Sequence, residues 1–127
     1  MNISDILNLK NLVVMGDYNS VLHTDESWGS ICRPDPLAGY ISHSFETHHM
    51  FDIRPNPMLP TWSNKRQGED YIAKRLDRAM VKGHLINLLG DMRFHLHISD
   101  ISDHMAVILS WRLEAARSGI PFKFNRA

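Results

Sequence analysis

The stretch Leu12–Asn19, LVVMGDYN, decides the fold expected for this chain. Leu12–Met15 is a run of apolar and partly β-branched residues, which is typical of a buried strand. The run ends abruptly at a glycine, so the strand is expected to present polar residues at its C-terminal end. Because side chains alternate along a strand, Asp17 and Asn19 are expected on one side and Tyr18 on the other.

The rest of the chain mixes helical and strand patterns. Ser4 is expected to cap a short helix, and the breakers between Thr24 and Gly39 indicate a long surface loop. The other expected elements are a helix over 37–50, a strand hairpin over 61–64 and 71–77, a helix that buries Leu85, Ile86, Leu88 and Leu89, and strands over 94–98 and 105–111. This order lacks the regular βαβα rhythm of a doubly wound sheet, so an α+β layered architecture is predicted.

Composition indicates one compact domain with no bulk charge. The chain has 127 residues, is 43% hydrophobic, and balances 14 basic against 14 acidic residues. Between Lys65 and Lys82 there are six basic and three acidic residues, the one candidate for an electrostatic footprint on nucleic acid. A solvated hairpin with mixed charges explains the same segment equally well.

The sequence carries no sign of secretion or of a membrane. Cys32 is the single cysteine, which excludes an intrachain disulfide and favours a reducing compartment. The N-terminus lacks the basic start of a signal peptide, and no apolar run approaches the roughly 18 residues that span a bilayer. An intracellular protein, nuclear or cytoplasmic and without a membrane partner, is expected.

Two polar motifs follow or precede expected strands. After the first strand, Asp17 could ligate a divalent metal or orient an attacking water, and the Asn19 amide could donate a hydrogen bond to a phosphate. Taken alone, Gly-Asp-x-Asn is more often a turn. Before the last strand, Ser102-Asp103-His104 joins three reactive groups, but adjacent side chains diverge and are not expected to form a triad with one another.

A histidine that holds transition-state charge needs a carboxylate behind its other ring nitrogen. Asp77, on a strand between Leu76 and Arg78, is the best candidate partner for His104. Each segment alone also reads as an ordinary strand end or polar turn. A zinc site built from His95, His97, Asp100 and His104 is disfavoured, because zinc ligand sets usually show tighter paired spacing with cysteine.

Four motifs occur in order: Gly-Asp-Tyr-Asn at 16–19, Thr-Trp-Ser-Asn at 61–64, Arg-Leu-Asp-Arg-Ala at 75–79 and Ser-Asp-His at 102–104. Together they resemble the endonuclease/exonuclease/phosphatase superfamily, with most likeness to the endonuclease-like domain of plant-type non-LTR retrotransposon proteins. The resemblance implies a four-layered α/β sandwich. Residues 1–112 correspond to its C-terminal portion with the N-terminal half missing, and 113–127, including Pro121–Phe124, to a tail leading toward a missing downstream region.

The resemblance also implies roles for single residues. Asp17 would position the nucleophilic water, Asn19 would contact the phosphate, and His104, held by Asp77, would stabilise the pentacovalent transition state. The implied metal ligands are Asp103 and Asp17. The implied phosphate-binding residues, the last four of them carried over more loosely, are Asn19, Ser63, Asn64, Arg75 and Arg78.

The chain departs from the family at its start, where the family's first Asn and metal-binding Glu have no counterpart. Mg²⁺ or Mn²⁺ is therefore expected to bind weakly if at all. Uncovered sheet edges and an exposed sheet face are expected to favour association. Three functions stay open: a DNA-cleaving endonuclease, a catalytically inert remnant, and a non-catalytic nucleic-acid-binding module. The sequence leaves DNA, RNA and smaller phosphoesters undistinguished as substrates.

Overall fold

A computed structural model describes residues 2–29, 33 and 35–112, so the tail 113–127 and the stretch 121–124 lie outside the described residues. Within the described part the protein is a small α+β domain with three short antiparallel sheets and few helices. The predicted α+β class is therefore confirmed at this level.

The central sheet has the strand order β1-β6-β3, formed by β1 (Val13–Asp17), β6 (Asp77–Lys82) and β3 (Met50–Asp52). Its middle strand β6 is buried from Asp77 to Val81. Strand β1 pairs with β6 in a register that sets Asp17 directly opposite Asp77. The polar end predicted for the first strand thus meets the polar start of another strand.

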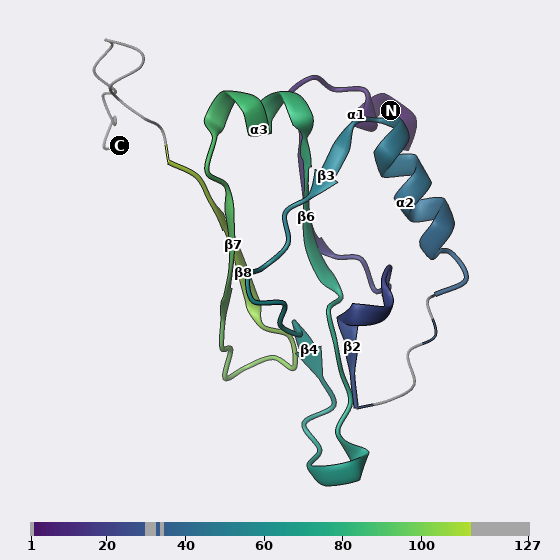
Figure 1. Cartoon of the computed structure of the whole chain (residues 1–127), viewed down its shortest axis with the longest axis vertical. Coiled ribbons are helices and arrows are strands. Elements are labelled where there is room, and N and C mark those ends of the chain that lie inside the picture. The colour runs from purple at the N-terminus through teal and green to yellow at the C-terminus, as the bar shows by residue number, and fades with distance from the viewer. Residues whose placement is uncertain (1, 30–32, 34, 113–127) are drawn as a thin grey trace.

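Two helices cover one face of this sheet, α1 (Ile3–Leu7) and α2 (Ala38–Thr47) (Figure 1). Helix α1 is capped by Asn2 and Asp5 in a reciprocal capping box, rather than by Ser4 as expected. Tyr18 turns to this side and stacks on Phe45, with ring centroids 5.7 Å apart. The buried core between helices and sheet consists of Leu7, Leu22, Ala38, Met50 and Met80.

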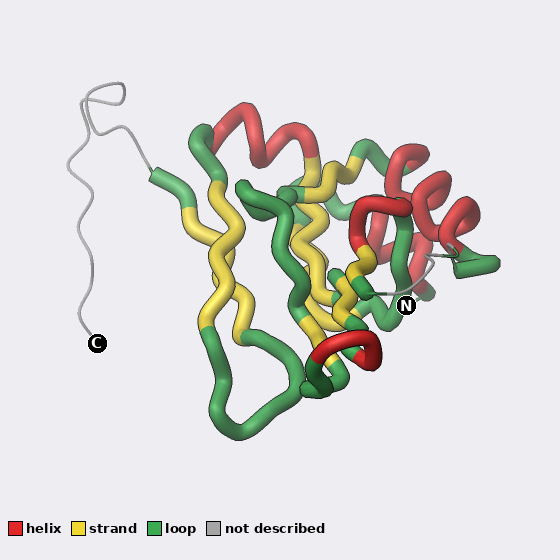
Figure 2. Tube along the Cα trace, turned by 60° about the horizontal axis from the view of Figure 1, so that its bottom comes forward, coloured by secondary structure: helices red, strands yellow, loops and turns green. Residues whose placement is uncertain are grey.

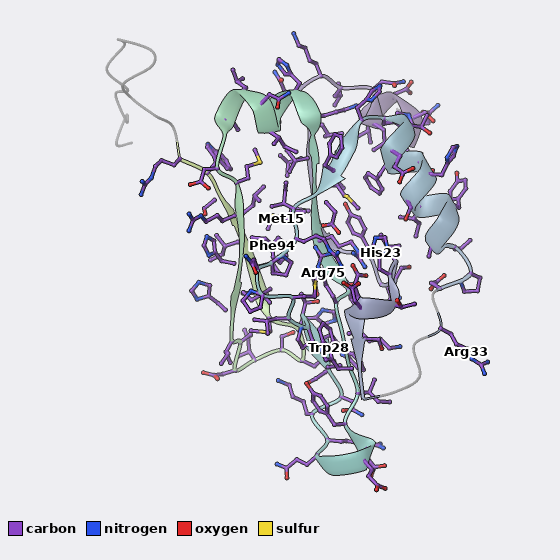
Figure 3. All side chains as sticks on the ribbon, viewed as in Figure 1. Met15, His23, Trp28, Arg33, Arg75 and Phe94 are labelled. Carbon is purple, nitrogen blue, oxygen red and sulfur yellow. The ribbon has the colours of Figure 1, made fainter. Side chains whose placement is uncertain are left out.

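A strand hairpin, β7 (Arg93–His97) with β8 (Ala106–Ser110), lies on the other side of the central sheet (Figures 1 and 2). Helix α3 (Gly83–Leu89) leads from β6 to this hairpin. Phe94 is buried on β7, and the guanidinium carbon of Arg75 lies 5.6 Å from its ring centroid, which joins hairpin and sheet (Figure 3). Helices, central sheet and hairpin form three successive layers.

The third sheet has the order β2-β5-β4, with β2 (Ser27–Trp28), β5 (Ala73–Lys74) and β4 (Trp62–Ser63). The 3₁₀ turn η1 (Thr24–Glu26) precedes β2, and η2 (Gly68–Asp70) lies at the tip of the loop between β4 and β5 (Figure 1). Because β5 is followed almost at once by β6, this small sheet continues the central one at the end where Asp17 and Asp77 lie.

Several expected elements are confirmed within a few residues: the first strand, the helix after the long loop, the hairpin strands, the helix α3 and the last two strands. The loop expected over 24–39 is wrong in part, because it contains η1 and β2 and buries Glu26 completely. Strand β3 was not predicted, and the strand expected over 71–77 is instead the short β5 followed by a separate strand, β6, that runs on to Lys82.

The burial expected for two elements is also wrong. Helix α3 has no buried residue, and Leu88 is 65% exposed. Strand β1 alternates in burial instead of being buried throughout, with Val13 and Met15 exposed by 40% and 39%. Strand β1 is an edge strand of the central sheet and pairs, within the described part of the chain, only with β6, and α3 lies at one end of the layers, between β6 and the β7–β8 hairpin (Figure 1).

No helix in the described part of the chain is long and apolar enough to cross a membrane.

Candidate active site

Three segments far apart in the sequence meet where the three sheets join. Asp17 ends β1, Asp77 begins β6, and His104 stands just before β8. An isolated antiparallel bridge pairs His104 with Trp62 of β4, which draws the Ser102–His104 segment onto the small sheet. The convergence is thus produced by backbone pairing.

The His104 ring lies between the two carboxylates. Its Nδ1 is 2.8 Å from Oδ2 of Asp77, a hydrogen-bonding distance, and its Nε2 is 3.8 Å from Oδ2 of Asp17. One ligand atom from each of the three residues lies within 4.8 Å of the others. The carboxylate predicted to support His104 is therefore the one that contacts it.

The surroundings favour the charged imidazole. The hydrogen bond to Asp77 raises the pKa of His104 against the opposing effect of burial, and the negative charges of Asp77, Asp17 and Asp103 act in the same direction as the hydrogen bond. The side chain of Asp77 is 10% exposed and that of Asp17 is 45% exposed. The inner carboxylate thus holds the ring, and the outer one faces solvent.

Asp17 and Asn19 form a turn as well as part of the site. Oδ1 of Asp17 accepts a hydrogen bond of 2.7 Å from the Asn19 backbone N–H, and Asn19 has a left-handed backbone with φ of 50°. Asn is among the few residues other than glycine that tolerate this conformation. The turn directs the chain so that Asn19 lines the same cavity as His104.

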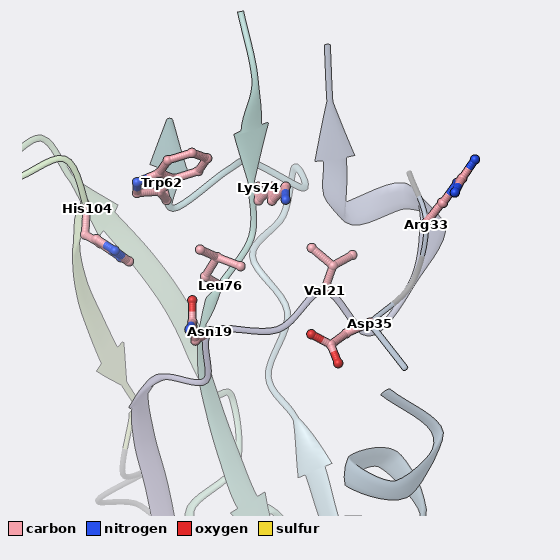
Figure 4. A pocket seen from close by; sticks show the side chains of 8 residues that line it. All are labelled: Asn19, Val21, Arg33, Asp35, Trp62, Lys74, Leu76 and His104. Atoms are coloured by element: carbon pink, nitrogen blue, oxygen red, sulfur yellow. The ribbon is translucent and has the colours of Figure 1, made fainter. Parts of the chain in front are cut away.

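That cavity has a volume of about 350 Å³ and opens beside His104 (Figure 4). Its apolar wall includes Trp62 and Leu76, and its charged groups include Lys74 on β5. The lining residues are Asn19, Val21, Arg33, Asp35, Trp62, Lys74, Leu76 and His104. The Lys74 ammonium, the Asn19 amide and the His104 imidazole could contact an anionic group, and Asp35 adds one negative charge to the lining.

Asp103 stands apart from the three-residue group. Its Oδ2 accepts a hydrogen bond of 2.8 Å from the Trp62 indole Nε1, which lowers the pKa of the Asp103 carboxyl. It is not among the residues whose ligand atoms converge with His104. The structure therefore places one of the two expected metal ligands, Asp17, beside His104, and the other against Trp62.

Ser63 and Asn64 do not line the cavity. The Asn64 side chain donates to the Asp70 carbonyl at 2.7 Å and accepts from the Ile72 and Arg66 backbone N–H groups, so it holds the loop between β4 and β5. The Ser63 hydroxyl oxygen accepts a hydrogen bond of 3.4 Å from the Lys65 backbone N–H. Both side chains serve the loop in this structure, whereas their neighbour Trp62 lines the cavity.

Arg75 and Arg78 are completely buried, with 0% exposure, and do not face a groove. Arg75 makes a bidentate pair with Asp52 at 2.6 Å for each bond, and Arg78 contacts Glu26 and the Ser20 carbonyl. Glu26 is itself 0% exposed. We therefore remove both arginines from the candidate phosphate contacts, because their guanidinium groups are used inside the protein.

Sequence reasoning missed Lys74 as a cavity residue and Glu26 and Asp52 as partners of the arginines. Lys74 belongs to the basic segment noted in the sequence. Because side chains alternate along a strand, a continuous strand through 74–77 would place Arg75 and Asp77 on one face and Lys74 on the opposite face, so nothing in the sequence grouped Lys74 with Asp77. No sequence signal identifies Glu26, which stands in the stretch expected to be a surface loop.

The donor set fits a divalent cation in part. Mg²⁺ prefers oxygen ligands, usually one or two protein carboxylates with waters and phosphate oxygens, and the exposed Asp17 carboxylate suits that role. Asp77 is less suited, since an oxygen of its carboxylate is occupied by His104. The zinc alternative is not supported, because among the described residues only Asp17, Asp77 and His104 converge, while His95 contacts Ser110.

No protein-family profile matches this chain, and no curated protein matches it significantly.

Proposed function

We propose that this protein hydrolyses phosphodiester bonds with a divalent cation, Mg²⁺ or Mn²⁺, and that its substrate is a DNA backbone. The observation that carries the proposal is the convergence of Asp17, Asp77 and His104 from three distant segments beside a cavity lined by Asn19 and Lys74. The ordered motifs that resemble the endonuclease/exonuclease/phosphatase superfamily supply the reaction class.

Each residue has a role that follows from its position. His104, oriented by Asp77 through Nδ1, presents Nε2 toward Asp17 and would stabilise negative charge on the phosphate during attack. Asn19 would donate its side-chain amide to a phosphate oxygen, and the Lys74 ammonium would offset the charge of the backbone. Asp17 would accept a hydrogen bond from the attacking water.

The exposed carboxylate of Asp17 explains why a cation belongs in the proposal. A phosphate beside Asp17 would meet like charge, which a divalent cation held by Asp17 would neutralise while it polarises the phosphoryl oxygen. Since the described residues bring one free carboxylate to this place, the affinity for the cation is expected to be low.

The layers support a finer proposal about the fold. Helices α1 and α2, the central sheet and the β7–β8 hairpin form successive layers, as part of a four-layered sandwich of the same superfamily would. We propose this architecture for the chain, with the site at the strand ends where the sheets meet.

The test is nicking of supercoiled plasmid across a titration of Mg²⁺ and Mn²⁺. Wild-type protein is expected to produce metal-dependent nicks, and His104→Ala to lower the rate by roughly 100-fold or more, as loss of a transition-state donor does. His97→Ala is the matched control, since His97 is exposed on β7 and lines no part of the cavity. Single-stranded RNA and a small diester assayed in parallel identify the preferred substrate class.

Equal nicking by wild type and His104→Ala would contradict the proposal. A second candidate, a catalytically inert remnant, is favoured by the single free carboxylate beside His104. Absence of nicking at every metal concentration, in protein that is folded by circular dichroism, would select it. The binding-module alternative rests on the basic segment over 65–82, and it loses two of the six basic residues there, because Arg75 and Arg78 are buried.

A further inference from the structure

Thr61, the residue before β4, is completely buried and contacts both segments that carry the His104 and Asp77 pair. Its hydroxyl oxygen accepts hydrogen bonds from the backbone N–H groups of Leu76 at 2.9 Å and Asp77 at 3.0 Å. Its carbonyl oxygen accepts from the Met105 N–H at 2.7 Å. One residue thus holds the backbone on both sides of the pair.

The hydroxyl acts at a break between two strands. Strand β5 ends at Lys74 and β6 begins at Asp77, so the chain steps from the small sheet to the central sheet between them. A buried backbone N–H needs an acceptor. At Leu76 and Asp77 the Thr61 hydroxyl supplies that acceptor, and it thereby fixes the point from which the Asp77 side chain departs.

The carbonyl fixes the other partner. Met105 follows His104, and its bond to Thr61 accompanies the bridge between Trp62 and His104. The backbone that carries the Asp77 carboxylate and the backbone that carries the His104 ring are therefore both hydrogen-bonded to Thr61. A contact of 2.8 Å between two side chains on separate elements tolerates little movement of either backbone.

We propose that Thr61 is a positioning residue, whose hydroxyl and carbonyl set the separation of the Asp77 carboxylate from the His104 ring. The proposal rests on the proposed function for its catalytic consequence, whereas its geometric content concerns the folded chain alone. A purely structural Thr61 would contribute to stability and leave the contact between Asp77 and His104 intact when the hydroxyl is removed.

The experiment compares Thr61→Val, which removes the hydroxyl and keeps the shape, with Thr61→Ser, which keeps the hydroxyl. The spectroscopic readout is the NMR signal of the His104 ring Nδ1–H in metal-free protein, assigned by its loss in His104→Ala. A hydrogen bond to a carboxylate is expected to hold this signal downfield in wild type and Thr61→Ser. In Thr61→Val the signal is expected to move upfield or to broaden by exchange with water.

Leu7→Ala is the matched control for general loosening, because Leu7 is buried on α1 in the helix-side core. It is expected to lower the thermal midpoint and to leave the ring signal in place. If Thr61→Val keeps the wild-type signal, or Leu7→Ala loses it as well, the positioning role is overturned.

A measurement on wild-type protein decides the case in which Thr61→Val does not fold. The amide protons of Leu76 and Asp77 are expected to exchange with solvent as slowly as those paired within β6. Fast exchange at both would overturn the proposal.

In an active protein, Thr61→Val is also expected to lower kcat by roughly 10- to 100-fold at nearly constant KM, with rescue by Thr61→Ser. Absence of nicking by the wild-type protein would contradict the proposed function. The His104 Nδ1–H signal and the exchange of the Leu76 and Asp77 amide protons would still decide the role of Thr61.

Discussion

Asp17 and Asp77 stand opposite each other across two antiparallel strands, a placement at which two like charges destabilise a sheet. The His104 ring relieves this repulsion, since it contacts Asp77 and lies 3.8 Å from Asp17. The stability of the sheet and the proposed chemistry thus depend on the same three groups. Removal of one is expected to change the ionisation of another.

Replacing Asp77 by Asn removes the charge and keeps the size of the side chain. Because the hydrogen bond to Asp77 is the main cause of the raised pKa of His104, that pKa is expected to fall toward its ordinary value of 6.5 in Asp77→Asn. The stability that the pair contributes is present below 6.5 and is lost as pH rises through the folded-state pKa. NMR titration of metal-free wild type and variant checks the shift, and an unchanged His104 titration would contradict it.

The pKa of Glu26 is shifted in the opposite direction to that of His104. Burial alone would raise its pKa, but the hydrogen bond and charge of Arg78, the Leu22 N–H and the charge of Arg75 outweigh burial and lower the pKa from 4.5 to about 2. The stability that Glu26 contributes is therefore present above pH 4.5 and is lost as the pH falls through about 2. Acid unfolding followed by circular dichroism is expected to begin within this window.

At pH 7, Glu26→Gln leaves two buried guanidinium groups with less compensation and is expected to cost about 3–5 kcal/mol of unfolding free energy. Chemical denaturation measures this loss. Glu46→Gln on the exposed side of α2 is the control, with a change within about 0.5 kcal/mol. Equal effects of the two substitutions would show that the buried pairs do not support the fold.

At the scale of single residues, the contact between Asp77 and His104 could be predicted from the sequence, whereas the burial of Arg75 and Arg78 could not. A strand that presents Asp17, and an Asp-His segment before another strand, are local patterns that a sheet brings together. Whether Arg75 and Arg78 face solvent depends on distant acids, Glu26 and Asp52, which no local pattern links to them.

At the scale of elements, β2 is followed by Gly29, where any other residue would force the neighbouring backbone to shift. A Cβ at Gly29 would lie 1.8 Å from the Tyr71 carbonyl oxygen, and the Gly29 φ of 82° is one that side chains disfavour. Strand β2 pairs with β5, which carries Lys74. The close approach of two backbones therefore supports the cavity wall.

Gly29→Ala is expected to lower the free energy of unfolding by roughly 1–3 kcal/mol. Gly39→Ala in α2 is the matched control, since a Cβ there meets nothing within 4 Å and alanine favours a helix by about 0.5–1 kcal/mol. Thermal unfolding of both variants measures the difference. A Gly29→Ala protein as stable as wild type would contradict the placement of β2.

Element types could be predicted from hydrophobic period, whereas short strands and burial could not. Strand β3, with Met50–Asp52, follows directly on a helical pattern and is too short to show alternation. Strand β2 has two residues and depends on its neighbour β5. The exposure of Leu88 on α3 depends on what packs above it, which a helical period does not encode.

At the scale of the whole molecule, the site exists because three sheets meet at one point. The central sheet supplies Asp17 and Asp77, the small sheet supplies Trp62 and Lys74, and the loop between β7 and β8 supplies His104. The resemblance carried by the four ordered motifs predicted that Asp17, Asp77 and His104 meet, but it did not predict that Lys74 lies beside them. The layers and the pairing of β4 with the segment before β8 could be seen only in the folded chain.

The central claim is that Asp77 and His104 act as one unit in phosphodiester hydrolysis, and a double-mutant cycle tests it most directly. Metal-dependent nicking rates are measured for wild type, Asp77→Asn, His104→Ala and the double variant. The account predicts that wild type nicks and that the double variant is no slower than His104→Ala alone, since residues that act together are not additive. Losses that multiply, or equal rates in all four proteins, would contradict it.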